Sequence, residues 1–310
     1  MGLNEVTLAG RIAIVTGAGG GLGRQHALLL ARRGAAVVVN DVGGPVDAPG
    51  ESHSSADQVV QEIRQAGGSA VPSGASVADP DQAVEILEIA LREFGRVDIL
   101  VNNAGIVRDR TFLKMSREEF LSVLDVHLTG AFNVTQPVFR KMREQGYGRI
   151  VHTSSTSGLF GNFGQSNYAA AKMGLLGLSR VLAIEGAKFN VSSNVVIPSA
   201  ATRMTQGLFG QDESLFAPSL VSPMVAFLAS DECTFSGDIF KAGGGHLARV
   251  FIAETDGIVR RPSEVTIEEI REHIDEIRST AHYFLPESSE DEYQRVVKML
   301  RQDKRAQGRA

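Results

Sequence analysis

Five short runs rich in valine and isoleucine recur along the first 200 residues of this 310-residue chain. They are Ile12–Thr16, Ala36–Asn40, Ile99–Asn102, Arg149–Thr153 and Val191–Ile197. None shows the alternation expected of a strand with one wet face, so each run predicts a strand buried on both faces. Helical segments are predicted at Leu22–Arg33, Ala56–Ala66, Asp81–Phe94, Glu118–Glu144 and Ser166–Phe189. This alternation predicts an α/β fold, a doubly wound parallel sheet with helices on both faces.

The composition changes near residue 250. From Arg261 onward 20 of 50 residues are charged, and runs typical of strands disappear. We therefore predict a main domain over residues 1–250 and a charged, helical C-terminal extension over 251–310.

One helix of this extension has a recognisable start. Thr266 is placed to cap it, with Glu269 three residues later. Four isoleucines follow on one face: Ile267, Ile270, Ile274 and Ile277. Such a stripe predicts a covered face, and two alternatives stay open: it packs on its own domain, or it shapes a substrate pocket or a subunit interface.

Composition excludes several classes of protein. A net charge of −5 argues against a nucleic-acid binder, which needs clustered lysine and arginine. No apolar run approaches the ~20 residues that a membrane span requires. Cys233 is the single cysteine, and no His/Cys/Asp cluster has metal-ligand spacing, so we expect no disulfide and no metal. Without a secretory signal or a peroxisomal tripeptide, we expect a cytoplasmic chain.

A glycine-rich loop follows the first predicted strand. Gly17, Gly20, Gly21 and Gly23, with Leu22 among them, lead directly into the first predicted helix. Glycines at this point permit a tight turn and let backbone N–H groups approach a pyrophosphate, while the start of the helix supplies partial positive charge. Because the loop lies between a strand and a helix at the start of an α/β chain, it predicts a Rossmann-like nucleotide site.

Asp41 directly follows the second predicted strand and lies 24 residues beyond Gly17. A carboxylate there can accept hydrogen bonds from the adenosine ribose and would repel a 2′-phosphate. No arginine or lysine stands at Gly20, Asn40 or Val42 to bind such a phosphate. The expected cofactor is therefore NAD rather than NADP.

Three residues, Ser155, Tyr168 and Lys172, form a predicted site for acid–base catalysis. Tyr168 and Lys172 stand at i and i+4 of one predicted helix, so their side chains can converge. Ser155 follows a predicted strand at the carboxyl edge of the sheet, where open α/β folds bind ligands. A secondary alcohol that loses hydride needs a base for its hydroxyl proton, and an ammonium group near a phenol typically lowers its pKa by about 1–3 units. We expect Tyr168 to act as acid and base, Lys172 to lower its pKa, and Ser155 to hold the substrate oxygen.

These motifs, in this order, resemble the short-chain dehydrogenase/reductase family across roughly residues 8–245. The motifs are the loop Gly17–Gly23, then Asn102-Asn103-Ala104-Gly105, then Ser155, then Tyr168-x-x-x-Lys172. The resemblance implies an NAD-dependent oxidoreductase. It assigns Asn103 to the adenosine-side ribose, Ser76 and Val77 to the adenine, Ile197 to the nicotinamide pocket and Lys172 to the nicotinamide ribose, with Ala104 and Gly105 in the cofactor site.

Other segments resemble one branch of this family, the (3R)-hydroxyacyl-CoA dehydrogenase module of peroxisomal multifunctional enzymes. They include Arg108-Asp109-Arg110, Gly161–Gln165 and the charged tail. This resemblance implies a 3-hydroxyacyl-CoA substrate. A hydroxysteroid or a steroid side-chain acyl-CoA is the main alternative, and a 3-oxoacyl-ACP reductase is disfavoured by Asp41. An NAD-binding scaffold or sensor is the non-enzymatic alternative.

Two positions depart from the family pattern, and its assembly is a further expectation. His127 stands where many members have asparagine, and we interpret it as a buried histidine bonded to backbone rather than a proton shuttle. Ser199 follows Pro198 where glycine is usual. The resemblance also implies a homodimer or homotetramer packed through the long central helices.

Overall fold

The computed structural model describes residues 5–43, 54–205, 207, 210–260 and 265–307. Contacts within the chain divide it into two compact units, Met1–Val250 and Phe251–Ala310. Each unit has its own secondary structure and is described by itself.

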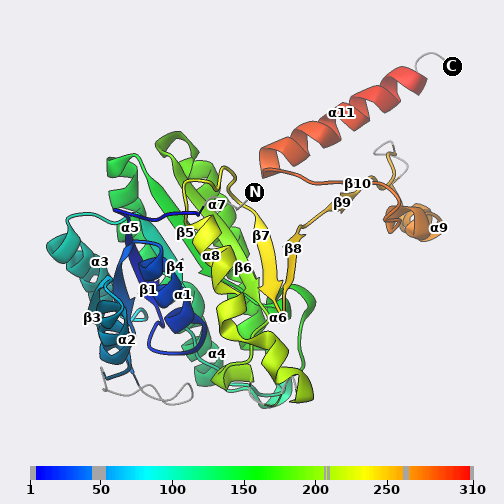
Figure 1. Ribbon diagram of the computed structural model, residues 1–310. Helices are drawn as coiled ribbons and strands as arrows, with labels where there is room; N and C mark the ends of the chain where they lie inside the picture. The colour runs from blue at the N-terminus through cyan, green and yellow to red at the C-terminus, as the bar shows by residue number, and fades with distance from the viewer. Residues whose placement is uncertain (1–4, 44–53, 206, 208–209, 261–264, 308–310) are drawn as a thin grey trace. The chain divides into compact units, whose positions relative to one another are not determined.

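The first unit contains an eight-stranded sheet (Figure 1). The strands are β1 (Ile12–Thr16), β2 (Ala36–Asn40), β3 (Ser69–Ser73), β4 (Ile99–Asn102), β5 (Gly148–Thr153), β6 (Val191–Pro198), β7 (Ile239–Gly243) and β8 (His246–Val250). Their order in the sheet is β3-β2-β1-β4-β5-β6-β7-β8, parallel throughout except for β8, which runs antiparallel to β7. The strand order reverses between β1 and β4, which creates a crevice at their carboxyl ends, where doubly wound folds bind ligands.

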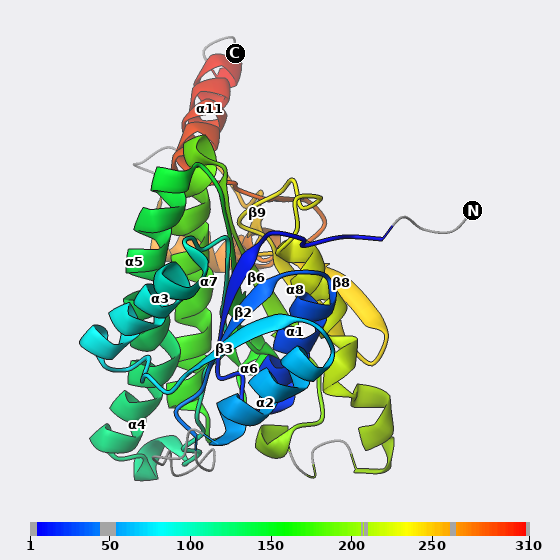
Figure 2. The same cartoon turned by 60° about the vertical axis from the view of Figure 1, so that its left-hand side comes forward.

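Helices cover both faces of this sheet (Figure 2). One face carries α1 (Gly21–Arg32), α2 (Ser54–Gln65) and α8 (Ser222–Leu228), and the other carries α3 (Pro80–Phe94), α5 (Gly130–Gln145) and α7 (Ser166–Gly186). Successive β1 residues enter opposite cores: Val15 packs with the α1 face and Ile14 with the α3 face. Each fully buried aliphatic side chain of this kind contributes about 1.5–3 kcal/mol to the stability of the fold. The predicted Rossmann-like α/β fold is confirmed, and burial of the strands on both faces is the reason for their continuous apolar runs.

The five predicted strands are present, but the sequence prediction omitted β3, β7 and β8. β3 contains Pro72 and exposes Ser69 at the edge of the sheet. β8, at the other edge, is the pairing partner of β7 alone and leaves most of its side chains exposed or half-buried. Edge strands lack the continuous apolar pattern of central ones, which is why these segments gave no clear signal.

The predicted helix Glu118–Glu144 is interrupted. It divides into α4 (Arg117–Leu124), a π-helical segment η2 (Asp125–Thr129) and α5. Single-turn π segments recur at functional sites because the extra residue per turn re-aims side chains. Here the segment contains His127, which is buried beside the residues predicted to be catalytic.

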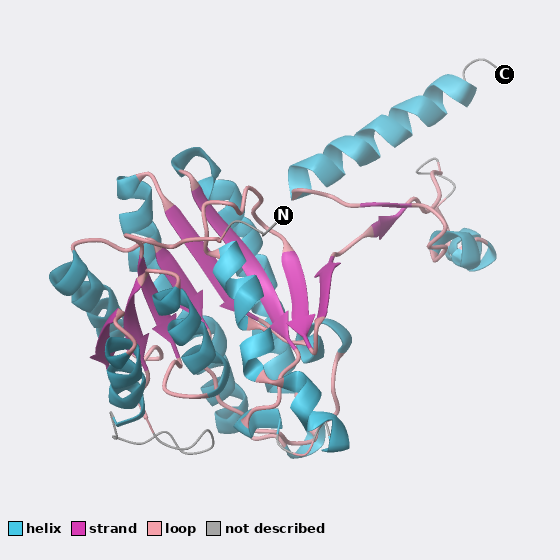
Figure 3. Ribbon diagram, in the orientation of Figure 1, coloured by secondary structure: helices cyan, strands magenta, loops and turns pink. Residues whose placement is uncertain are grey.

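The second unit consists of short elements and one long helix, as its colours in Figure 3 show. A two-stranded antiparallel sheet pairs β9 (Glu254–Thr255) with β10 (Tyr283–Phe284). The expectation that strands disappear after Arg261 was therefore wrong for β10. The helices are α9 (Ile267–Glu272), α10 (Ile274–Ile277) and α11 (Ser289–Gln307).

The predicted helix start at Thr266 is confirmed, because its hydroxyl accepts a hydrogen bond from the Glu269 amide at 3.1 Å. The isoleucine stripe does not lie on one continuous helix, since His273 ends α9 before α10 begins. Among the described residues, no helix combines the length and apolar character that crossing a membrane requires.

Candidate active site

The glycine-rich loop connects β1 to α1 at the carboxyl edge of the sheet. Gly17 has a φ of 63°, and a Cβ placed on it would lie 2.7 Å from the Cα of Ala104. A Cβ on Gly23 would lie 2.1 Å from the carbonyl oxygen of Gly17. Only glycine fits either position without moving backbone, so these residues form the tight turn that the sequence predicts.

The N-terminus of α1 is open to a ligand. Its N-cap residue, Gly20, makes no side-chain capping bond, and the first turn contains no acidic residue. The first N–H groups of a helix need partners, and together with the helix dipole they favour an anion. The loop and the start of α1 therefore fit a pyrophosphate.

Asp41 lies directly against this loop. One carboxylate oxygen accepts a hydrogen bond from the Gly19 amide at 2.8 Å, and the other accepts one from the Gly43 amide at 2.8 Å. These two bonds hold the carboxylate at the cleft and leave lone pairs for further donors. Such a group suits the ribose hydroxyls that NAD offers.

Most predicted cofactor residues line one cleft of about 1040 Å³, part of it open to solvent. They are Gly17, Gly20, Gly21, Leu22, Asp41, Ser76, Val77, Asn103, Ala104 and Gly105. Gly23 instead packs beneath the loop, against Gly17. Ile197 is fully buried in a core cluster with Leu176, so its side chain is not part of the cleft wall.

Sequence reasoning missed part of this wall. Thr202, Arg203 and Met204, which follow β6, also line the cleft. A Cβ placed on Gly20 would lie 3.3 Å from a guanidinium nitrogen of Arg203, so a cation stands near the loop where the charge argument found none. The signal available in the sequence was their place after a strand, at the same carboxyl edge.

Ser155, Tyr168 and Lys172 converge on the next part of this edge. Ser155 ends the loop after β5 and caps α6 (Thr156–Phe160), while Tyr168 and Lys172 lie in the first two turns of α7. The Lys172 Nζ lies 5.5 Å from the centroid of the Tyr168 ring. Ser155 is hydrogen-bonded to the phenol. The i, i+4 spacing therefore brings the two side chains together, as expected.

Burial shifts the pKa values of both Tyr168 and Lys172. Burial raises the pKa of Tyr168 to about 12; the hydrogen bond from Ser155 opposes this rise and the charge of Asp109 adds to it. Lys172 is itself buried, and burial lowers its pKa to about 7. Its ammonium donates to the Thr153 carbonyl oxygen at 2.6 Å rather than to the phenol. Among the protein groups, burial has the largest effect on the pKa of Tyr168. The expectation that Lys172, together with a positively charged nicotinamide, lowers this pKa stays a prediction.

His127 is buried against backbone, as we interpreted it. Its Nε2 lies 2.7 Å from the Ile106 carbonyl oxygen and 3.0 Å from the Ile106 amide nitrogen. Burial, and then the charge of Lys172, lowers its pKa well below the usual value, so the ring is neutral. Its plane lies perpendicular to the Tyr168 ring at 5.1 Å. A Cβ on Gly105 would lie 2.2 Å from the His127 Cε1, which explains the glycine at that position.

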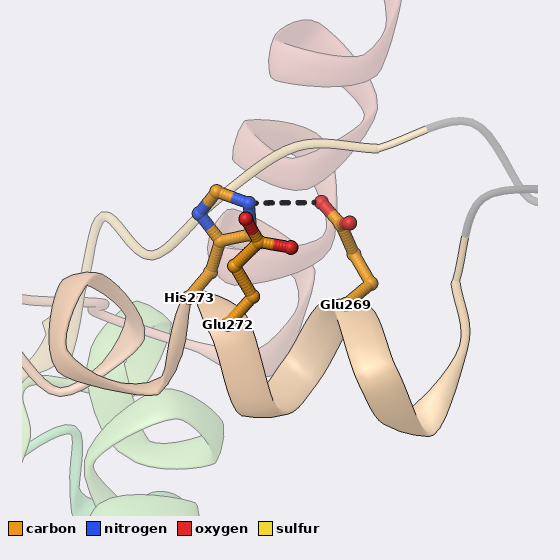
Figure 4. Close-up of side chains that lie close together, drawn as sticks. All are labelled: Glu269, Glu272 and His273. Atoms are coloured by element: carbon orange, nitrogen blue, oxygen red, sulfur yellow. Dashed lines mark ion pairs between the residues drawn. The ribbon is translucent and has the colours of Figure 1, made fainter.

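The second unit gathers three residues of metal-binding type, a group that sequence reasoning did not find. Glu269, Glu272 and His273 place their ligand atoms within 4.8 Å of one another (Figure 4). The guanidinium of Arg260 is paired with the Glu269 carboxylate and lies 3.0 Å from the His273 Nε2. The Arg260 guanidinium already partners two of the three side chains, so we interpret this cluster as an ion-pair network.

A glycine-lined cleft beside a Ser–Tyr–Lys cluster, at the switch point of a doubly wound sheet, defines a nucleotide-dependent oxidoreductase. The short chain dehydrogenase family model matches residues 11–213, and the chain belongs to this family. It is an oxidoreductase, and the alternative of a binding-only scaffold is not retained.

Relatives sharpen this placement within the family. The chain is 52% identical over 249 residues to a putative short-chain type dehydrogenase/reductase of Mycobacterium tuberculosis, covering 80% of this chain and 87% of that protein. It is 50% identical over 269 residues to peroxisomal multifunctional enzyme type 2 of Drosophila melanogaster, covering 85% of this chain and 44% of the relative. The chain therefore spans less than half the length of this second relative.

A solved structure agrees with the sequence comparison. The full-length peroxisomal multifunctional enzyme type 2 from Drosophila melanogaster superposes with a TM-score of 0.80 at 39% identity. The match covers 96% of this chain and 50% of that one. The resemblance to the dehydrogenase branch of the multifunctional enzymes, predicted from short segments, is thus confirmed over most of the chain.

Proposed function

We propose that this chain uses NAD to interconvert a 3-hydroxyacyl-CoA and its 3-oxo form. The observation that carries the proposal is the convergence of Ser155, Tyr168 and Lys172 beside the glycine-lined cleft. The similarity to a multifunctional enzyme of peroxisomes supports the choice of substrate class.

The reaction follows from the positions of these side chains. Ser155 binds the substrate oxygen, and Tyr168 accepts the hydroxyl proton during oxidation or donates it during reduction. When bound, oxidised NAD supplies the hydride acceptor and a positive charge that favours the phenolate. Lys172 holds the nicotinamide ribose and, in its charged form, also favours the phenolate.

The cofactor residues are part of the same proposal. The carboxylate of Asp41 accepts hydrogen bonds from the adenosine ribose hydroxyls, and Asn103 contributes to the same ribose site. Ser76 and Val77 border the adenine, and the backbone at Ile197 contributes to the nicotinamide pocket. The preference for NAD rests on the carboxylate of Asp41 at the cleft.

Substrate identity has one main alternative. A hydroxysteroid or a steroid side-chain acyl-CoA presents the same secondary alcohol to Tyr168, attached to a bulkier body. A 3-oxoacyl-ACP reductase is the less favoured alternative, because such reductases usually take NADPH and Asp41 repels its 2′-phosphate.

A substrate panel tests the proposal. The protein is mixed with NAD or NADP and with 3-hydroxyacyl-CoA thioesters of several chain lengths, steroid alcohols and steroid side-chain thioesters, and NADH or NADPH fluorescence is followed. We expect NADH from (3R)-hydroxyacyl-CoA and little signal with NADP. Turnover of steroid alcohols alone would replace the acyl-CoA assignment, and no turnover of any member would overturn the proposal.

Assembly and location complete the proposal. We propose a homodimer or homotetramer, supported by apolar side chains exposed on the long central helices: Phe132 of α5 and Val181 and Ile184 of α7. Analytical ultracentrifugation tests this, and a monomer at micromolar concentration would contradict it.

We further propose residues 1–250 as the catalytic domain and 251–310 as an appended helical unit. The cytoplasmic location stays a prediction, and several relatives are named as peroxisomal proteins.

A further inference from the structure

Asn167 precedes Tyr168, and its side chain is fully buried. Its amide nitrogen donates to the Arg108 carbonyl oxygen at 2.9 Å and to the Glu119 carbonyl oxygen at 3.1 Å. Its amide oxygen accepts from the Tyr168 backbone N–H at 2.7 Å. Both donors and the acceptor are thus engaged, and a buried amide with this many bonds is costly to replace.

The three partners of Asn167 belong to three different elements. Arg108 lies in the loop of residues 103–111 that follows β4, Glu119 lies in α4, and Tyr168 lies in the first turn of α7. One side chain therefore ties together segments about 50 to 60 residues apart in the sequence. The glycine loop of the cofactor cleft makes none of these contacts.

The same loop is held at two further points. Upstream, His127 is bonded to the backbone of Ile106 at 2.7 Å. Downstream, the Arg110 amide donates to the Gly164 carbonyl oxygen at 2.9 Å, and the Gln165 amide donates to the Asp109 carboxylate at 2.8 Å. The bond from Asn167 to the Arg108 carbonyl oxygen lies between these two points along the loop. Of the bonds that join the loop to residues 164–167, it is the one made by a buried side chain.

This loop also contains Asp109, whose negative charge raises the pKa of Tyr168. Four groups act on the phenol: the Ser155 hydroxyl at the start of α6, the Lys172 ammonium from α7, the His127 ring from η2 and, through its negative charge, the Asp109 carboxylate from the loop. Three of the four are fixed by their own helices. The distance from Asp109 to the phenol depends on where the loop is tied.

We propose that Asn167 is a positioning residue, whose amide fixes the loop of residues 103–111 against the start of α7 and so sets the wall of the substrate site beside the Tyr168 hydroxyl. The inference rests on the proposed function for its effect on turnover. Its structural part, the tie between loop and helix, stands on the three hydrogen bonds alone.

A double-mutant cycle tests the functional part. Asp109→Asn removes a negative charge near Tyr168, so in the wild-type background it should shift the rising limb of the pH profile of kcat/KM for oxidation to lower pH. In the Asn167→Ala background the same change should give a clearly smaller shift, because the loop no longer holds Asp109 in place. Asn167→Ala itself should reduce kcat/KM for the hydroxy substrate about tenfold or more. The Kd of NADH should rise by a smaller factor, because the cleft-lining start of the loop is also held by the bonds between His127 and Ile106. An equal shift in both backgrounds would overturn the proposal.

Hydrogen exchange tests the tie without any turnover. In Asn167→Ala, amides of residues 105–113 should exchange faster, while those of β1, β2 and α1 stay as in wild type. Unchanged exchange in the loop would overturn the inference whatever the substrate is. If the wild-type enzyme turns over no substrate, the proposed function is wrong. Hydrogen exchange still tests whether Asn167 holds the loop against α7.

A second variant guards against misfolding. Gln165→Met removes the exposed bond to Asp109 and leaves the buried amide in place, so it should fold and should shift the pH profile in the direction of Asp109→Asn by a smaller amount. Should Asn167→Ala not fold, Asn167→Ser, which keeps a small polar side chain but loses the amide that bonds Arg108 and Glu119, replaces it in the double-mutant cycle with Asp109→Asn. An equal shift in the wild-type and Asn167→Ser backgrounds would then overturn the proposal.

Discussion

The cofactor cleft and the catalytic cluster lie side by side at one edge of the sheet, but they are built differently. The cleft is made chiefly of backbone: Gly17 and Gly23 leave space that a Cβ would fill, and the start of α1 presents free N–H groups. The cluster is made of buried side chains whose pKa values are shifted, Lys172 and His127 above all. We therefore expect the cleft to lose cofactor binding when atoms are added to its glycines, and the cluster to lose activity when atoms are removed from its side chains.

The largest expected effect comes from removing one oxygen atom from the cluster. Tyr168→Phe should lower kcat about 10²- to 10⁴-fold, because general acid–base catalysis contributes on this order. The Kd of NADH, measured by fluorescence titration, should stay close to that of wild type. Ser155→Ala is the matched comparison, and we expect a smaller loss of kcat with a higher KM. Wild-type turnover in Tyr168→Phe would show that the phenol is not the acid and base.

The next effect comes from adding one carbon atom to the cleft. In Gly23→Ala the new Cβ would lie 2.1 Å from the Gly17 carbonyl oxygen, so the loop must shift. We expect unfolding free energy to fall by about 1–3 kcal/mol and NADH binding to be severely weakened. Gly20→Ala is the control, because its Cβ would meet only the flexible end of Arg203 at 3.3 Å. Equal effects at the two glycines would contradict the argument from space.

A charge change sharpens the contrast inside the cleft, where Asp41 is a side chain among backbone groups. Asp41→Ala should weaken NAD binding about 10- to 100-fold, the usual value of hydrogen bonds to a charged group, and should weaken NADP binding less. The ratio of kcat/KM for NAD and NADP measures this preference. An unchanged ratio would mean that another residue, with Arg203 the first to examine, sets the preference.

In one further expected effect the two regions behave alike, and for a single histidine it is no larger than the effects above. Burial lowers the pKa of His26, in α1, and of His152, in β5, to about 3. The unfolded chain takes up these protons near pH 6.5, so between about pH 6.5 and 3 it binds more protons than the folded chain, and stability falls as the pH is lowered. From pH 7 to pH 5 each histidine should cost on the order of 2 kcal/mol.

Urea unfolding at both pH values measures this loss. His26→Gln should reduce it, and His246→Gln, which removes an exposed histidine, should not. A stability that is flat between pH 7 and pH 5 would show that the buried histidines are not held neutral.

Much of the catalytic cluster and the cleft could be predicted because its signals are local. The i, i+4 spacing of Tyr168 and Lys172, and the place of the glycine loop between strand and helix, follow from chain geometry that holds wherever such segments fold. Asp41 directly follows a predicted strand, and parallel strands end at one edge, so its place beside the loop could be expected. Ser76 and Asn103 were assigned by the family resemblance alone, and Ser76 follows β3, which the sequence did not predict. The edge strands β3 and β8, and β7 beside β8, could not be predicted, because half-exposed strands lack a continuous apolar pattern.

The sequence by itself determined the parallel sheet, its helices and the glycine loop, and it predicted the side chains proposed to react, since periodicity and spacing fix which faces are buried and which residues share a turn. Tertiary structure alone decided the electrostatics. The pKa of Lys172 falls and that of Tyr168 rises because both are desolvated among segments distant in the chain. Arg203 approaches Gly20, and Asn167 binds the carbonyl oxygens of Arg108 and Glu119, across about 50 to 180 intervening residues. Burial and long-range contacts of this kind depend on how elements pack, which no local pattern specifies.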